Sequence, residues 1–109
     1  IHVLGDASAQ GDMPKSGFSA NSQAKVAAMA VRGALTGSKV FPAKFSNTCW
    51  SLIDDNDGIK VGASYEATDE KIAKTSGFVS ATGEDAALRK ATYEESVGWY
   101  AGITADMFG

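Results

Sequence analysis

Seven residues of this 109-residue chain have the types and positions that chemistry at a bound ligand requires. A carboxylate accepts hydrogen bonds from hydroxyl groups, an ammonium group attracts negative charge, and a thiolate is a nucleophile. An indole ring offers a flat surface for stacking. In chain order the candidates are Gly5, Asp6, Lys15, Ser16, Gly17, Cys49 and Trp99.

Asp6 follows an apolar run, Ile-His-Val-Leu at residues 1–4, and the turn residue Gly5. The run predicts a buried strand that ends at the Gly5-Asp6 turn. Ligands of open α/β sheets bind just beyond strand ends, where a carboxylate can accept hydrogen bonds from ribityl or ribose hydroxyls. The alternative is an aspartate that only caps the turn. Because chains rarely begin inside a strand, we expect this one to be part of a longer protein.

The segment Lys15-Ser16-Gly17 precedes the best-defined helix of the sequence, residues 20–35. Backbone N–H groups, the positive end of the helix dipole and an ammonium group suit a negatively charged ligand. A phosphate or the pyrimidine ring of a reduced flavin has that character, although the spacing does not match a Walker A loop. The alternative is an ordinary loop with Ser16 or Ser19 as the N-cap.

Cys49 and Trp99 each allow two interpretations. A lone cysteine in a strand is most often a buried small hydrophobe, and this is what the local pattern favours for Cys49. It could also form a disulfide with a cysteine outside the chain. Trp99 either packs the last helix onto the neighbouring strands or stacks beside a cofactor. His2 has no partner motif and is expected to be structural.

The elements that must position these residues are predicted from local patterns. Apolar residues at spacings of three and four predict helix 20–35, which ends at Gly37. The acidic segment 54–58 is a strong turn signal; it is too short for a calcium loop. The other predicted elements are strands at 45–53 and 58–65, a weak strand at 71–75, another at 77–81, and a helix at 84–108 that is interrupted near Gly98 or Gly102.

We therefore expect an α/β chain in two parts. Residues 1–37 form a βα unit of the kind found in nucleotide-binding domains. Residues 38–109 form a small α+β domain, an antiparallel meander closed by a helix.

Composition narrows the function. The chain carries 10 Lys and Arg against 13 Asp and Glu, a net charge of −3, so a nucleic-acid partner is not expected. One cysteine and one histidine exclude a disulfide framework and the usual multi-ligand metal sites. No apolar run reaches the roughly 20 residues of a membrane-spanning helix, and from the residues at the start we expect no targeting segment there.

Taken in order, the motifs resemble the C-terminal part of the flavoprotein subunit of flavocytochrome c sulfide dehydrogenase. The blocks Met-Pro-Lys-Ser-Gly at 13–17 and Asn-Thr-Cys at 47–49 are specific to that pattern. Gly-Asp-Ala at 5–7 is shared by many reductases with two dinucleotide folds. Further matching blocks are residues 1–4, 18–23, 50–51, 99–100 and 106–109.

The resemblance implies an enzyme of the periplasm that carries FAD, oxidises sulfide and passes electrons to a c-type cytochrome subunit. Residues 1–37 would be the end of its FAD-binding domain, with Gly5 and Asp6 holding the ribityl chain of the cofactor. The segment Lys15-Ser16-Gly17 would face the pyrimidine edge of the flavin. Cys49 would be the C-terminal member of a redox-active cysteine pair, and Trp99 would line the same pocket.

Departures from the pattern leave the site incomplete. The first cysteine, the glycine-rich fingerprint and the covalent flavin attachment lie upstream in the family and are not in this chain, and position 50 holds Trp where another aromatic is usual. The chain is expected to be inactive without the remaining N-terminal part of the flavoprotein. Two alternatives stay open: a non-catalytic dimerisation or partner-binding module, and a fragment of a sulfide:quinone-type reductase. Glu94 and Glu95 argue against the membrane-binding helix typical of the latter.

Overall fold

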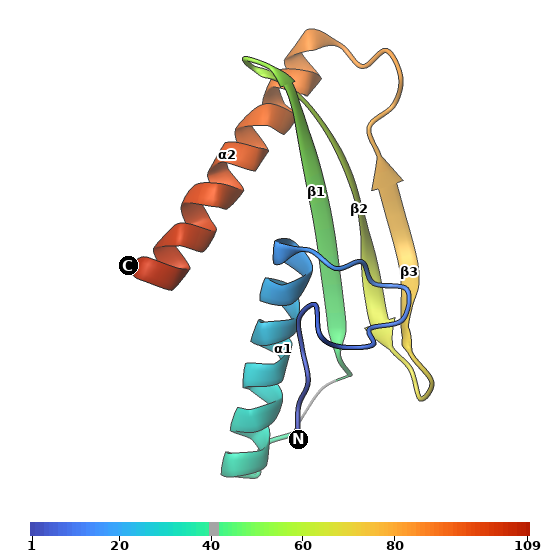
Figure 1. Ribbon diagram of the computed structural model, residues 1–109, viewed down its shortest axis with the longest axis vertical. Helices are drawn as coiled ribbons and strands as arrows, with labels where there is room; N and C mark the ends of the chain where they lie inside the picture. The colour runs from blue at the N-terminus through green and yellow to red at the C-terminus, as the bar shows by residue number, and fades with distance from the viewer. Residues whose placement is uncertain (40–41) are drawn as a thin grey trace. The chain divides into compact units, whose positions relative to one another are not determined.

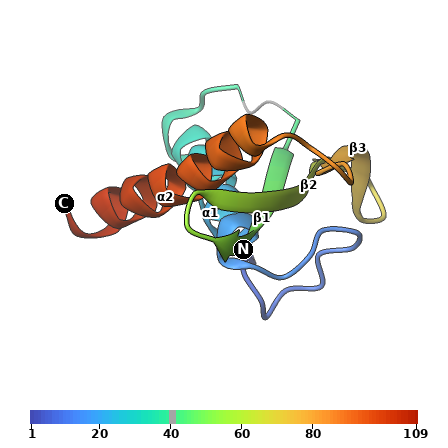
Figure 2. The same cartoon turned by 90° about the horizontal axis from the view of Figure 1, so that it is seen from above.

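The computed structural model describes residues 1–39 and 42–109, and it contains a three-stranded sheet and two helices. The strands lie in the order β1-β2-β3, which Figures 1 and 2 show from two directions. This confirms the expected antiparallel meander with helices in an α/β chain. The elements are α1 (Gly17–Thr36), β1 (Lys44–Asp54), β2 (Asp57–Ala67), β3 (Ile72–Val79) and α2 (Ala86–Phe108).

Helix α1 covers the predicted residues 20–35 and begins three residues earlier, at Gly17. Its N-cap is Ser16, whose Oγ accepts a hydrogen bond from the Ser19 N–H at 3.0 Å. It ends at Gly37, which adopts the left-handed conformation with φ 70°. Glycine takes this conformation without the steric cost that a Cβ brings, so the stop is encoded at a single residue.

The two connections of the sheet are short turns, as the sequence indicates. Residues 55–56 join β1 to β2, and Asn56 has φ 56°, a conformation that asparagine tolerates better than most residues. Between β2 and β3 the Thr68 N–H donates to the Lys71 carbonyl at 2.8 Å. Because the turns are short, strands that follow one another in sequence lie side by side in the sheet, which gives the simple meander.

Three predicted details are wrong. Residues 1–4 form no strand with any described residue, and Ile1 and Val3 are exposed, because a strand requires a neighbouring strand to pair with. The separate strands at 71–75 and 77–81 are one strand, β3. Gly77 does not break it; the missing side chain instead makes room for the Lys74 chain, whose Cε lies 2.7 Å from the position of a Gly77 Cβ. Helix α2 runs through Gly98 and Gly102 without interruption, since one glycine costs a helix only about 1 kcal/mol.

The chain divides into two compact units, which we describe separately. The loop unit consists of Ile1–Thr48 and Gly62–Phe78. Its core is Met13, Ala63 and Tyr65, with Phe45 and Ile72 packed against it.

The cysteine unit consists of Cys49–Val61 and Val79–Gly109. Helix α2 approaches the β1–β2 hairpin closely at Gly58, where a Cβ would lie 3.1 Å from the backbone nitrogen of Tyr93. Thr92 is the one buried residue described in α2. Within the described residues, neither helix is long and apolar enough to cross a membrane. The domain division at residues 37 and 38 stays a prediction.

Candidate functional site

Two buried glutamines organise the loop before α1. The Gln23 Oε1 on α1 accepts a hydrogen bond from the Gly5 N–H at 2.8 Å, and its Nε2 donates to the Gln10 Oε1 at 3.1 Å. The Gln10 Nε2 donates to the carbonyls of Met13 and Pro14 at 3.0 and 2.6 Å. Both glutamines are about 95% buried, with relative exposures of 6% and 5%. The pair therefore joins the Gly5 turn and the segment leading into α1 in one hydrogen-bonded network.

Gly5 shapes the turn that presents Asp6. It has φ 81°, and its carbonyl accepts hydrogen bonds from the backbone N–H and the Oγ of Ser8 at 3.0 and 2.7 Å. The Gly5 N–H donates to Gln23, so both the N–H and the carbonyl of Gly5 form hydrogen bonds within the protein. The Asp6 side chain next to it is exposed and available to a ligand.

The start of α1 is anchored to strand β1. The Ser16 Oγ, which caps the helix, donates to the Asn47 Oδ1 at 2.6 Å, and Asn47 is buried. Gly17 is exposed, with no heavy atom within 4 Å of the position of a Cβ, and Lys15 is exposed beside it. The first turn has no acidic residue. The positive end of the helix dipole therefore faces open space next to an ammonium group.

A second clamp holds the loop against β3. The Asp12 N–H donates to the Ile72 carbonyl at 2.9 Å, and its carboxylate accepts from Lys71 Nζ at 2.8 Å and from the Lys74 N–H at 3.2 Å. These hydrogen bonds, that from Lys71 first, hold the pKa of the Asp12 carboxyl below its usual value. Gly11 permits the approach: it has φ 65°, and a Cβ would lie 2.7 Å from the Ile72 oxygen.

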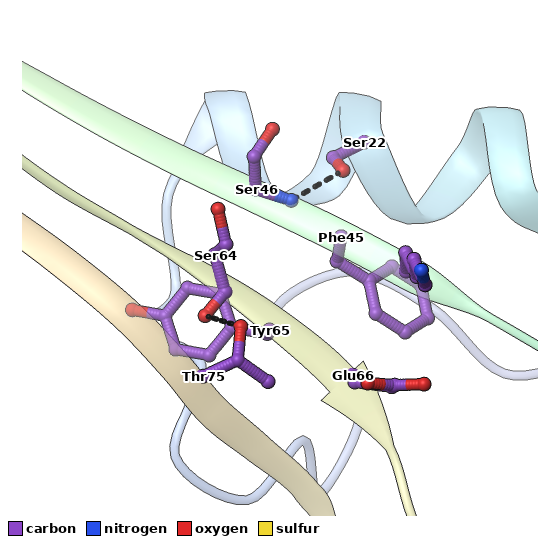
Figure 3. A pocket seen from close by; sticks show the side chains of 8 residues that line it. Ser22, Phe45, Ser46, Ser64, Tyr65, Glu66 and Thr75 are labelled. Carbon is purple, nitrogen blue, oxygen red and sulfur yellow. Dashed lines mark hydrogen bonds between the residues drawn. The ribbon is translucent and has the colours of Figure 1, made fainter.

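The loop unit also contains an open pocket of about 380 Å³ between α1 and the sheet, shown in Figure 3. The Ser46 N–H donates to the Ser22 Oγ at 3.1 Å at one side, and the Thr75 Oγ1 donates to the Ser64 carbonyl at 3.1 Å at the other. None of the seven predicted site residues lines it. Its lining is Ser22, Lys44, Phe45, Ser46, Ser64, Tyr65, Glu66 and Thr75.

In the cysteine unit, Cys49 is exposed on β1, so the interpretation as a buried hydrophobe is wrong. The next residue, Trp50, packs against Trp99 of α2 with ring centroids 5.7 Å apart and a tilt of 31°. This confirms that Trp99 packs the last helix onto the strands. Its contact with a cofactor remains a prediction.

An ion pair flanks the tryptophans. Lys60 Nζ on β2 lies 2.7 and 2.9 Å from the two carboxylate oxygens of Glu95 on α2. The Trp50 Nε1–H donates to Glu95 at a long 3.5 Å. The hydrogen bond from Lys60, with a smaller effect of Trp50, holds the pKa of the Glu95 carboxyl below its usual value, although burial opposes the shift.

The structure thus groups the predicted residues in two places and adds partners that the sequence did not reveal. Lys15, Ser16 and Gly17 are contiguous at the α1 start, and the glutamine network connects that segment with the Gly5 turn. Trp99 contacts the residue that follows Cys49. The missed residues are Gln10, Gln23, Asn47, Lys60 and Glu95. Only Asn47 carried a signal, because it lies in the Asn-Thr-Cys block.

A family model described as "Flavocytochrome c sulphide dehydrogenase, flavin-binding" matches residues 42–108. The match spans all three strands and helix α2, so it includes Cys49 and Trp99. It begins after the loop and helix that carry Gly5, Asp6 and Lys15-Ser16-Gly17. The description confirms a flavin as the expected cofactor.

Proposed function

The chain belongs to the flavocytochrome c sulfide dehydrogenase flavin-binding family, and we propose that it forms one side of the site where an oxidoreductase flavoprotein oxidises sulfide. The exposed Cys49 within the matched region is the observation that carries the proposal. In this proposal Cys49 would belong to a cysteine pair that takes electrons from sulfide, FAD would supply the acceptor when bound, and a c-type cytochrome subunit would be the partner. The name of the family supports the cytochrome as partner.

The loop unit fits one edge of the cofactor. The pyrimidine edge of a flavin has carbonyl oxygens and gains negative charge on reduction. The α1 start offers N–H groups, no acidic residue and the Lys15 ammonium, which are complementary to that edge. The exposed Asp6 carboxylate suits hydroxyls of the ribityl chain. When bound, FAD supplies a two-electron acceptor that the amino acids themselves lack.

The chemistry at Cys49 is thiol–disulfide exchange. We propose that Cys49 forms a disulfide with a cysteine supplied by the remaining part of the flavoprotein. Hydrosulfide attacks this bond: a new S–S bond forms to one cysteine as a persulfide, and the other cysteine leaves as a thiolate with the electron pair of the broken bond. Both the second cysteine and the substrate must reach the Cys49 sulfur, and its exposure meets that requirement.

The test is Cys49→Ser in the complete flavoprotein, with bleaching of the flavin by sulfide followed without oxygen. The variant should keep its FAD and lose sulfide-dependent reduction by at least about 100-fold, because serine cannot form the disulfide that hydrosulfide attacks, and removal of a group that reacts covalently costs several powers of ten. Ser51→Ala, a change at an exposed position on the same strand, is the control and should reduce the flavin at the normal rate. An active Cys49→Ser variant would leave the non-catalytic module as the better interpretation.

The partner and compartment need their own tests. We propose that the protein is periplasmic, which suits transfer to a c-type cytochrome. Sulfide-reduced flavoprotein mixed with the cytochrome subunit should reduce the haem. Transfer to a soluble quinone analogue without reduction of the cytochrome would instead favour the quinone-reductase alternative.

A further inference from the structure

We propose that Glu95 and Lys60 are positioning residues for Cys49, and that they act by fixing the Trp50–Trp99 pair. This inference rests on the proposed function, because it assigns a means of orienting the thiol that function requires. Neither residue needs to contact sulfide or the flavin.

The first step is that Trp50 is the anchor of the strand segment that carries Cys49. Of residues 49–54, Trp50 alone is partly buried; the other five are exposed, with Leu52 and Ile53 at 52% and 56% of their full exposure. A strand end with exposed side chains has few contacts that hold it in one conformation. The direction of the Cys49 side chain therefore depends strongly on how well its neighbour Trp50 is held.

The second step is that α2 holds Trp50 by two residues of one helix face. Trp99 supplies the ring contact at 5.7 Å, and Glu95 accepts the indole N–H. Residues four positions apart lie on the same face of a helix, so Glu95 and Trp99 contact Trp50 from the same side.

The third step is that Lys60 fixes Glu95. Its ammonium group contacts both carboxylate oxygens, at 2.7 and 2.9 Å, and connects β2 to α2. The two side chains are 30% and 49% exposed, so the pair contributes little to overall stability. The pair instead acts on geometry. Through Lys60, Glu95 and Trp50 it connects β2, α2 and β1 at the residue next to Cys49.

The helix offers a matched control for this pair. Lys90 and Glu94 also form an ion pair, but at 3.9 Å, with both side chains more than half exposed and both on α2. That pair connects no strand to the helix. Glu94→Gln thus removes the same charge from the adjacent position without disturbing a contact of Trp50.

The experiment compares Glu95→Gln, Lys60→Gln and Glu94→Gln in the complete flavoprotein. The rate of flavin reduction at saturating sulfide should fall about 10-fold in the first two, since a misplaced reacting group can cost up to 100-fold, and should stay unchanged in the third. Near-ultraviolet circular dichroism from the tryptophan pair should weaken in the same two variants. The reversed pair, Lys60→Glu with Glu95→Lys, restores the ion pair but leaves the indole N–H without its acceptor, so it should recover only part of the rate.

Two further results separate the possible failures. Should the reversed pair not fold, Trp50→Phe, which keeps an aromatic anchor but removes the indole N–H, should give an intermediate loss of rate. Equal rates in Glu95→Gln and Glu94→Gln, with Cys49→Ser inactive, would overturn the positioning role and leave the proposed function intact. An active Cys49→Ser variant would remove the proposed function itself.

Discussion

The two units of the chain are stabilised in different ways. All three buried hydrophobic residues that the structure describes, and four of its five buried polar residues, belong to the loop unit. The cysteine unit has one buried polar residue, Thr92, and its contacts include a tryptophan pair and partly exposed ion pairs, which orient side chains more than they add stability. The loop that we propose to face the cofactor is thus shaped by internal hydrogen bonds, whereas the strand with the thiol is left accessible. We expect substitutions in the first unit to reduce stability and substitutions in the second to change the reaction.

Gln23→Leu should have the largest effect on stability. The substitution leaves the partly buried Gly5 N–H without its acceptor and removes the hydrogen bond from Gln23 to the Gln10 Oε1, which keeps only Ser8 Oγ as a donor. The unsatisfied N–H costs about 1–3 kcal/mol and the lost hydrogen bond about 0.5–1.5 kcal/mol, so the free energy of unfolding should fall by about 2–4 kcal/mol. Denaturant unfolding measures the loss. Ala24→Gln, at the adjacent exposed position, should change it by less than about 0.5 kcal/mol, and an equal effect of both would contradict the network.

Gly11→Ala should have the next largest effect, and Gly17→Ala is its control. At Gly11 the backbone has φ 65° and a Cβ would lie 2.7 Å from the Ile72 oxygen, so about 1–3 kcal/mol of stability should be lost. At Gly17 the space is open and the residue begins a helix, so alanine should be neutral or stabilising by about 0.5 kcal/mol. Thermal unfolding of both variants checks the difference. A tolerant Gly11 would mean that the loop is not held against β3.

The features of the two units that could be predicted from the sequence are those determined by residues close together in the chain. Helix α1, its Ser16 cap and its Gly37 stop follow from residues within a few positions of one another, and so does the turn after β1. The strand expected at residues 1–4 failed because pairing depends on a distant strand. The sequence predicts an interruption of α2 near Gly98 or Gly102 because glycine weakens a helix; the helix continues because one glycine costs it only about 1 kcal/mol.

The site was predicted less completely than the fold for the same reason. Lys15 and Cys49 carry recognisable chemistry, and both are exposed. The residues that position them carry no such recognisable pattern in the sequence. Gln23 and Gln10 are 13 positions apart, and Lys60 and Glu95 are 35 apart, so no helical or strand spacing relates them. Exposure of Cys49 was equally hidden, since strand alternation alone does not identify which face is covered.

Lys15→Gln should change the reduction potential of the cofactor and not the stability of the fold. Lys15 is exposed, so its removal should leave unfolding almost unchanged. A charge at a helix terminus is worth about 0.3–1 kcal/mol, which corresponds to roughly 7–20 mV for a two-electron couple. The reduction potential of the flavin in the complete flavoprotein should become more negative by this amount, measured by titration with redox dyes. Lys25→Gln, two turns further along α1, should shift it less; equal shifts would mean that the α1 start does not face the flavin.

The smallest expected effect is on the stability of the fold at low pH. It can be measured for each unit through one carboxylate. Asp12 in the loop unit and Glu95 in the cysteine unit both have lowered pKa values in the folded state, caused first by hydrogen bonds from Lys71 and Lys60. Folding is therefore favoured while these groups are ionised, and this contribution is lost as the pH falls below about 4 and through the folded-state pKa values. Asp12→Asn and Glu95→Gln should each flatten the loss of stability in this range, measured by denaturant unfolding. Because both ion pairs are at least partly exposed to solvent, added salt should reduce the difference from the unmodified chain. If Asp12→Asn leaves the acid response unchanged while Glu95→Gln removes it, then the clamp on β3 contributes shape alone, and acid sensitivity is confined to the unit that carries the thiol.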